Sequence, residues 1–294
     1  MKNVNKNRKP FKPGDFAMDV IIYTILIGLT LVCLYPIWYV IVASFSSSTA
    51  IAKQGSMMLW PSEIDLGAYK MVFKDDGLIR GFKNSVLVLL GALPINMIMT
   101  VMCGYFMSCT GVFWKKLIVG LIMFTMFFGG GMIPSFLNIK DLKLYNTLLA
   151  LILPGAVNVT NAIICKTSIE AIPDSLKESA YLDGATDVQI ITRIIVPLIK
   201  ATLAVLALYY GVGHWNSWFS AAIYLKSDEL MPVQNVLRNI LLANSEKELD
   251  GAFNEYADII KYAAIVVSTL PIMCVYPFLQ KYFTKGALIG AVKG

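Results

Sequence analysis

The sequence predicts an all-α membrane protein with six transmembrane helices, and two observations lead to this prediction. Apolar residues make up 57% of the 294 residues and charged residues only 15%, whereas an ordinary soluble domain has about 25% charged residues. The mean hydropathy of +0.65 suits lipid better than water. The apolar residues also gather into six stretches that are each long enough to cross about 30 Å of hydrocarbon.

In chain order, the predicted spans cover residues 20–44, 85–108, 117–133, 144–165, 201–225 and 262–279. The first runs for about 25 residues without a small-residue cleavage site, so we interpret it as retained rather than as a removable signal peptide. Gly129, Gly130 and Gly131 lie at the outer end of the third span. For these glycines we expect close helix packing, with a flexible break of the helix as the alternative.

Both chain termini are predicted to lie in the cytoplasm. A cluster of basic residues ahead of the first span usually fixes the orientation of the spans, and here it consists of Lys2, Lys6, Arg8, Lys9 and Lys12. Six spans then return the chain to the same side of the plasma membrane. The predicted organisation is a cytoplasmic basic segment at 1–19, a transmembrane domain at 20–283 and a cytoplasmic tail at 284–294.

Several classes of function are disfavoured by what the sequence lacks. No Asp, Glu, Lys or Arg lies in the six apolar cores, which disfavours a proton- or sodium-coupled carrier. No G-x-x-x-x-G-K-[ST] phosphate loop is present, so energy from ATP would have to come from another chain. His214 is the single histidine, and the five cysteines form no C-x-x-C pair. We therefore expect no metal site, no cofactor and no catalytic centre.

The cytoplasmic loop at 166–200 is the one inner segment that is long enough to fold. Gly184 suits the left-handed turn that ends a helix, and Pro197 is expected to open the fifth span. The loop contains two candidate capping boxes, which are Ser175 with Glu178 and Thr186 with Gln189. The pattern predicts two short helices in an elbow that another protein can approach, with a solvated hairpin that merely links spans as the alternative.

This loop resembles the EAA loop of type I ABC importer permeases. The family pattern is E-A-A, three residues, G, nine residues and I-x-L-P. The chain has Glu178-Ser179-Ala180, Gly184 and Ile194-x-Val196-Pro197 at the same spacing. Ser179 and Val196 depart from the pattern, but each is a small or apolar replacement.

The resemblance implies the type I importer permease fold and a loop that docks in a cleft of an ATP-hydrolysing subunit. The residues that it assigns to docking are Glu178, Ser179, Ala180, Asp183, Gly184 and Ala185. ATP hydrolysis would then belong to partner subunits, and this chain would not be an enzyme.

Softer motifs resemble the carbohydrate-uptake branch, and within it the maltose-type second permease subunit of the complex-oligosaccharide subgroup. They are the glycine run at 129–131, Asn146-Thr147, Leu153-Pro154-Gly155, Gly213-His214-Trp215-Asn216-x-Trp218 and Tyr282-Phe283-x-Lys285-Gly286. The resemblance implies import of carbohydrate by alternating access. The implied partners are a second, different permease, two ATP-binding subunits, an extracytoplasmic solute-binding protein, the sugar and membrane lipid, and no nucleic acid.

Six imidazole, amide and indole side chains are candidates for the substrate path. They are His214, Trp215, Asn216, Trp218, Asn158 and Asn161. His214 lies near the middle of the fifth span, where contact with lipid would be costly, so we expect it to face the bundle interior or a wet cavity. Indole faces would pack on sugar rings, and amide and imidazole groups would bond hydroxyls. Interhelical hydrogen bonding with ordinary aromatic packing is the alternative.

The sequence leaves three alternatives to sugar import. A permease for a polyol or glycerol phosphate is the first, although the lack of buried basic residues disfavours phosphate. An ion-coupled carrier that needs no ATPase is the second. A membrane enzyme that uses His214 is the third, and it lacks an evident acid partner or nucleophile at the same depth.

Overall fold

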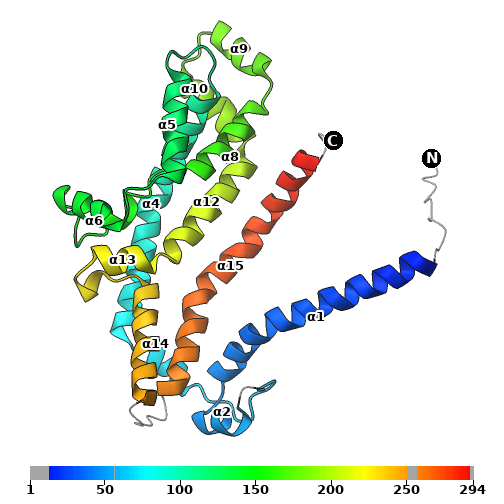
Figure 1. The fold of residues 1–294 in the computed structure, drawn as a ribbon, viewed down its shortest axis with the longest axis vertical. Coiled ribbons are helices and arrows are strands. Elements are labelled where there is room, and N and C mark those ends of the chain that lie inside the picture. The colour runs from blue at the N-terminus through cyan, green and yellow to red at the C-terminus, as the bar shows by residue number, and fades with distance from the viewer. Residues whose placement is uncertain (1–12, 56, 250–256, 292–294) are drawn as a thin grey trace. The chain divides into compact units, whose positions relative to one another are not determined.

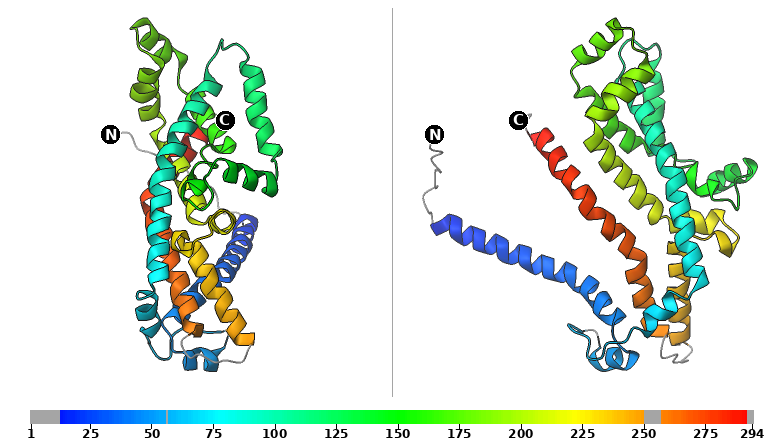
Figure 2. Two further views of the ribbon diagram at one scale, coloured as in Figure 1. Left: turned by 90° about the vertical axis from the view of Figure 1, so that its left-hand side faces the viewer. Right: turned by 180° about the vertical axis from the view of Figure 1, so that it is seen from behind.

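A computed structural model gives the fold and describes residues 13–55, 57–249 and 257–291 (Figures 1 and 2). Within these residues the regular structure is helical, apart from one isolated bridge between Ser46 and Ile64. The chain divides into two compact units, Met1–Lys70 with Phe253–Val266, and Met71–Ala252 with Val267–Gly294.

The helices begin and end as follows. They are α1 (Pro13–Ser44), α2 (Ser48–Gln54), α3 (Gly67–Val72), α4 (Asp76–Ser108), α5 (Lys115–Phe127), α6 (Met132–Asp141), α7 (Leu149–Ile152), α8 (Val159–Glu170), α9 (Asp174–Leu182), α10 (Asp187–Ile190), the π-helical η1 (Ile191–Ile195), α11 (Val196–Leu198), α12 (Lys200–Trp215), α13 (Trp218–Tyr224), the 3-10 turn η2 (Asp228–Leu230), α14 (Val233–Leu249) and α15 (Ala257–Ala291).

The first unit is built on α1, whose side chains at 18–34 are all exposed although they are mostly apolar. Such a continuous apolar surface requires lipid or another protein to cover it. Contacts gather at the other end of the helix. The indole of Trp38 donates to the carbonyl of Leu59 at 2.9 Å, and the ring of Tyr39 meets that of Tyr262 edge-on at 5.8 Å.

The second unit is organised around α4, which packs against α8, α12 and α14. Glycines allow these helices to approach closely. A Cβ atom added to Gly104 would lie 3.0 Å from the Cβ of Cys165 on α8, and one added to Gly81 would lie 3.0 Å from the Cα of Val233 on α14. In Figure 1, the elbow of α9 and α10 lies at the end of this unit opposite α14.

Two helices among the described residues are long and apolar enough to cross a membrane by themselves, Met18–Ser44 and Asp76–Ser108. Two further pairs pass this test only when each bent pair counts as one span. Lys115–Phe127 with Met132–Asp141 is bent by 115°, and Asp187–Leu198 with Lys200–Trp215 by 87°. Ile259–Val275, from the last predicted span, is shorter. Six spans therefore stay a prediction.

Three predicted spans differ from continuous helices. The span at 117–133 ends early at Phe127, and the glycines that follow form a break, because a Cβ on Gly129 or Gly131 would meet no atom within 4 Å. Among the described residues, these glycines thus show the break that was the alternative, and close packing against another chain stays a prediction. The span at 144–165 is broken between α7 and α8 around Pro154, whose ring removes a backbone donor. The span at 201–225 is broken between α12 and α13.

Candidate functional site

The predicted elbow is present in the loop at 166–200. Gly184 has a φ of +77° and ends α9, as the left-handed turn requires. Its N–H donates to the carbonyl of Tyr181 at 3.0 Å, and the N–H of Ala185 donates to that of Ala180 at 2.9 Å. Thr186 and Gln189 form the predicted capping box of α10. The turn and the second capping box are thus confirmed.

Two local predictions for this loop are wrong. Ser175 and Glu178 do not form a capping box, because α9 begins at Asp174 directly after Pro173 and Ser175 already lies in its first turn. Pro197 does not open the fifth span. It lies in α11 after the π-helical turn η1, which accommodates a residue without an N–H, and α12 begins at Lys200.

The elbow exposes some of its EAA residues and buries one. Glu178, Ser179, Asp183 and Gly184 are exposed, while Ala180 is buried. Ala180 belongs to an apolar cluster with residues of α4, α8, α10, η1 and α12, which are Val101, Cys165, Ile169, Ile190, Ile195 and Leu206. The elbow is therefore packed on the helices beneath it.

A polar cluster adds a second link between the elbow and α4. The hydroxyls of Tyr105 on α4 and Tyr181 on α9 both donate to Oδ1 of Asp187 on α10, at 2.7 and 2.5 Å. The two hydrogen bonds lower the pKa of Asp187 below its ordinary value, and the bond from Tyr181 has the larger effect. The hydrogen bond that Tyr181 donates to Asp187 raises the pKa of Tyr181 above its ordinary value. The carboxylate is thus charged at neutral pH and joins three helices.

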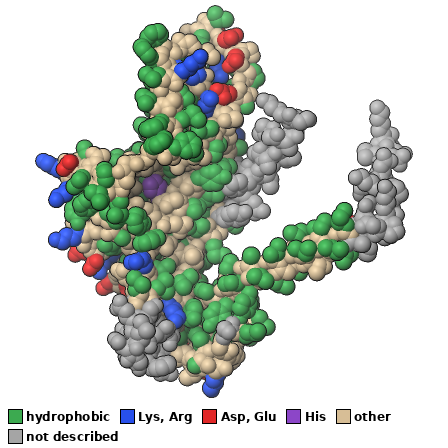
Figure 3. Space-filling view, viewed as in Figure 1, with side chains coloured by type: hydrophobic (Ala, Val, Ile, Leu, Met, Phe, Trp, Pro, Cys, Tyr) green, Lys and Arg blue, Asp and Glu red, His purple; other side chains and the backbone are tan. Residues whose placement is uncertain are grey.

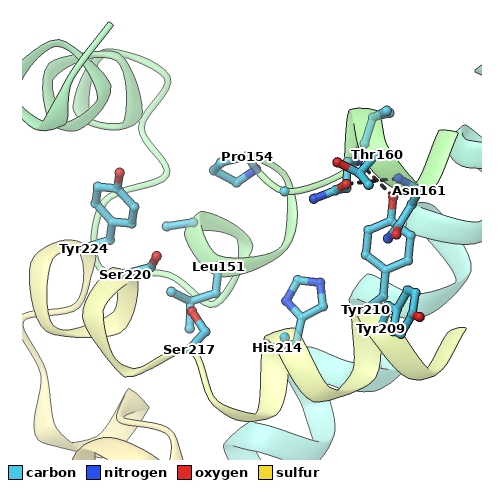
Figure 4. Close-up of a pocket in the computed structure, with 15 residues that line it drawn as sticks. Leu151, Pro154, Thr160, Asn161, Tyr209, Tyr210, His214, Ser217, Ser220 and Tyr224 are labelled. Carbon is cyan, nitrogen blue, oxygen red and sulfur yellow. Dashed lines mark hydrogen bonds between the residues drawn. The ribbon is translucent and has the colours of Figure 1, made fainter. Parts of the chain in front are cut away.

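A cavity of about 670 Å³ lies within the second unit, between the broken stretch around Pro154 and helices α8, α12 and α13 (Figure 4). Of the described residues that line it, none is Asp, Glu, Lys or Arg. Hydroxyl, amide and imidazole groups supply its polarity, from Asn158, Thr160, Asn161, Tyr209, Tyr210, His214, Ser217, Ser220 and Tyr224. In Figure 3, His214 lies in a hollow among uncharged side chains.

The structure brings together three of the six predicted path residues. His214, Asn158 and Asn161 all line the cavity. Asn158 is also the N-cap of α8, and its side chain accepts from the N–H of Asn161 at 3.1 Å.

The other three predicted path residues lie outside the cavity. Trp215 is buried, and its indole donates to the carbonyl of Ser268 at 3.1 Å. Asn216 ends α12 and is exposed. The ring of Trp218 lies 4.8 Å from the guanidinium carbon of Arg238. The position of Trp215 fits packing, whereas Asn216 and Trp218 are exposed, and a role for these three residues in the path stays a prediction.

Sequence reasoning missed the residues that frame the cavity. Asn96 on α4 donates to the carbonyls of Gly155 and Ala156 at 2.6 and 3.1 Å. The hydroxyl of Tyr210 lies 2.7 Å from that of Thr100 and accepts from the N–H of Asn158 at 2.9 Å. The available signal was an amide inside an apolar span, since a polar side chain at that depth needs a partner.

Comparison with known proteins agrees with this architecture. The polygalacturonan/rhamnogalacturonan transport system permease protein YtcP of Bacillus subtilis (strain 168) is 37% identical over 281 residues, which cover 94% of this chain and 98% of that protein. Protein LplC of the same organism is 38% identical over 282 residues, covering 95% of each chain.

A solved structure gives the same result. A bacterial ABC transporter involved in the import of the acidic polysaccharide alginate contains a chain with a TM-score of 0.86 and 32% identity, covering 93% of this chain and 99% of that one. Residues 96–288 match the family model described as binding-protein-dependent transport system inner membrane component. With this match over most of its length, the chain belongs to the family of binding-protein-dependent transport system inner membrane components, the permeases of ABC importers.

Proposed function

We propose that this chain is a six-span permease subunit of an ATP-driven importer of oligosaccharides, with both termini in the cytoplasm. The observation that carries the proposal is the cavity, because its hydroxyl and amide groups suit the hydroxyls of a sugar and it offers no formal charge to an ion. The transport of polygalacturonan, rhamnogalacturonan and alginate by similar proteins supports carbohydrate as the substrate class.

The elbow is the proposed docking site for an ATP-binding subunit. Its residues for this role are Glu178, Ser179, Ala180, Asp183, Gly184 and Ala185. Closure of two ATPase subunits would move the docked elbow, and the apolar cluster and the Tyr105–Tyr181–Asp187 contacts would pass that movement to α4 and α8. The spans would then turn from inward-open to outward-open.

The proposed substrate path runs past His214, Asn158 and Asn161 in the cavity. Tyr209 and Tyr224 add aromatic rings to its lining, and such rings suit the apolar faces of sugars. A second, different permease would close the path from the other side. A solute-binding protein would deliver the sugar from outside, as the family description implies.

The test is reconstitution of the whole complex in liposomes, with partner permease, ATPase and binding protein. We expect labelled oligosaccharide to enter only when ATP and binding protein are both supplied. The control is the same complex with a hydrolysis-deficient ATPase, which should not import. Uptake that persists in this control and follows an imposed proton or sodium gradient would refute the proposal in favour of an ion-coupled carrier.

A further inference from the structure

The amide of Asn96 is held in one orientation by the broken stretch between α7 and α8. Its side chain is fully buried, and Nδ2 donates to the carbonyl oxygens of Gly155 and Ala156. The flipped amide would place Oδ1 against both of these oxygens, where acceptor would face acceptor. Oδ1 must therefore lie on the opposite side, toward α12.

This orientation fixes the hydrogen on the ring of His214. Oδ1 of Asn96 lies 2.9 Å from Nε2 of His214, and an amide oxygen can only accept, so Nε2 carries a hydrogen. No Asp or Glu lines the cavity to stabilise a second hydrogen on the ring. His214 is thus the neutral Nε2–H form, and Nδ1 carries a lone pair.

The lone pair has no protein donor among the residues that the structure describes, since the ring makes its hydrogen bond to these residues through Nε2. Figure 4 shows the ring pointing from α12 toward the stretch that holds Pro154, into the cavity. A Cβ on Gly155 would lie 3.8 Å from Cε1 of the ring, an ordinary van der Waals distance, so the backbone of this stretch passes close to the ring without crowding it.

Other polar groups in the cavity divide into two sets. The hydroxyl of Tyr210 is engaged by Thr100 and by the N–H of Asn158, while Asn96 lies behind the lining and is fully buried. The side-chain hydroxyls of Thr160, Ser217 and Ser220 make no hydrogen bond with the described residues and line the cavity. The cavity thus holds several groups that can donate hydrogen bonds. It also holds one aromatic acceptor, Nδ1 of His214, whose direction is fixed.

We infer that Nδ1 of His214 is a preset acceptor for a hydroxyl of the transported sugar, and so the centre of a subsite for an uncharged, polyhydroxylated ring. A sugar hydroxyl can donate to the lone pair, whereas a carboxylate presents its own lone pairs and is repelled. If the sugar is acidic, its carboxylates must therefore point away from this nitrogen. This inference rests on the proposed function and names the part of the substrate that this chain contacts.

Two substitutions separate the roles of the two ring nitrogens. In His214→Gln the amide nitrogen reaches the position of Nε2 and can still donate to Asn96, but no acceptor remains at Nδ1. In His214→Asn the shorter amide places an oxygen near Nδ1 and loses the bond to Asn96. We expect His214→Gln to lower uptake by the reconstituted complex about fivefold to tenfold, the worth of one hydrogen bond. We expect His214→Asn to retain more uptake but to lower the melting temperature.

A wild-type complex that imports, together with a His214→Gln complex that imports equally well, would overturn the inference alone. A wild-type complex without ATP-dependent import of any glycan would instead refute the proposed function. A spectroscopic readout is independent of uptake. In ring-¹⁵N-histidine spectra, the difference between the wild-type and His214→Gln complexes should show an unprotonated Nδ1, and a hydrogen on Nδ1 would refute the inference.

Discussion

At the residue scale, Gly184 offers the sharpest test of the elbow. Its φ is +77° and a Cβ there would meet no atom within 4 Å, so a side chain would strain the backbone by about 1 kcal/mol without an internal clash. If the elbow docks to an ATPase, Gly184→Arg should abolish uptake in an assembled complex, because the long side chain would occupy the docking surface. ATP-dependent uptake in liposomes measures the effect.

Gly111 provides a matched control for this substitution. It also has a φ of +77° with no atom within 4 Å of an added Cβ, and it lies in the connection between α4 and α5 rather than in the elbow. Gly111→Arg should therefore carry the same backbone strain and keep most of the uptake. Equal loss in both variants would mean that strain, and not docking, explains the result for Gly184.

Individual residues differed in how far the sequence could place them. Gly184 and Thr186 followed from turn and cap chemistry, which depends on neighbours a few residues away. His214 followed from the cost of an imidazole at membrane depth. Trp215 could not be assigned, because the direction of a side chain depends on the rotation of α12, and the structure turns this indole to the carbonyl of Ser268. Asn96 gained its role from a helix break 59 residues away.

At the element scale, the start of α10 depends on a side-chain cap and the start of α9 does not. Thr186→Ala should remove the cap of α10 at a cost of about 1 kcal/mol, which makes hydrogen exchange of amides 187–190 about fivefold faster. Ser175→Ala should leave exchange in α9 unchanged, because Ser175 makes no capping bond. Faster exchange in α9 after Ser175→Ala would show that the capping box rejected above does form.

The breaks within spans explain why helix boundaries were harder to predict than the helices. Apolar composition identifies a segment that avoids water, but it does not indicate where the backbone of that segment bends. Pro197 satisfied the rule for the first turn of a helix, yet it lies in the short helix α11 after the π-helical turn η1, and α12 begins three residues later. Pro154 interrupts its segment, and the side chain of Asn96 donates to the carbonyls of Gly155 and Ala156 beside the break.

At the scale of the whole molecule, two of the six predicted crossings depend on short helices. The 13 residues of α5 and the 12 of α8 are each about 20 Å long or less, too short to cross about 30 Å of hydrocarbon alone. The crossing after Lys116 needs α5 together with the glycine break, and the crossing after Lys140 needs α7, the stretch around Pro154 and α8. Together with the bent fifth span and the shorter helix at Ile259–Val275, these two crossings decide whether the chain has six spans.

Single cysteines at exposed positions test both crossings in intact cells. We expect a membrane-impermeant thiol reagent to label Lys74→Cys, Lys140→Cys and Lys226→Cys from outside, and to reach Lys116→Cys and Asp183→Cys only after the cells are opened. The unmodified chain, with its five native cysteines, is the background control. If Lys116→Cys and Lys140→Cys label from the same side, α5 and α6 form a re-entrant loop. If Lys140→Cys and Asp183→Cys do so, the fourth crossing is absent, and either result contradicts the six-span arrangement.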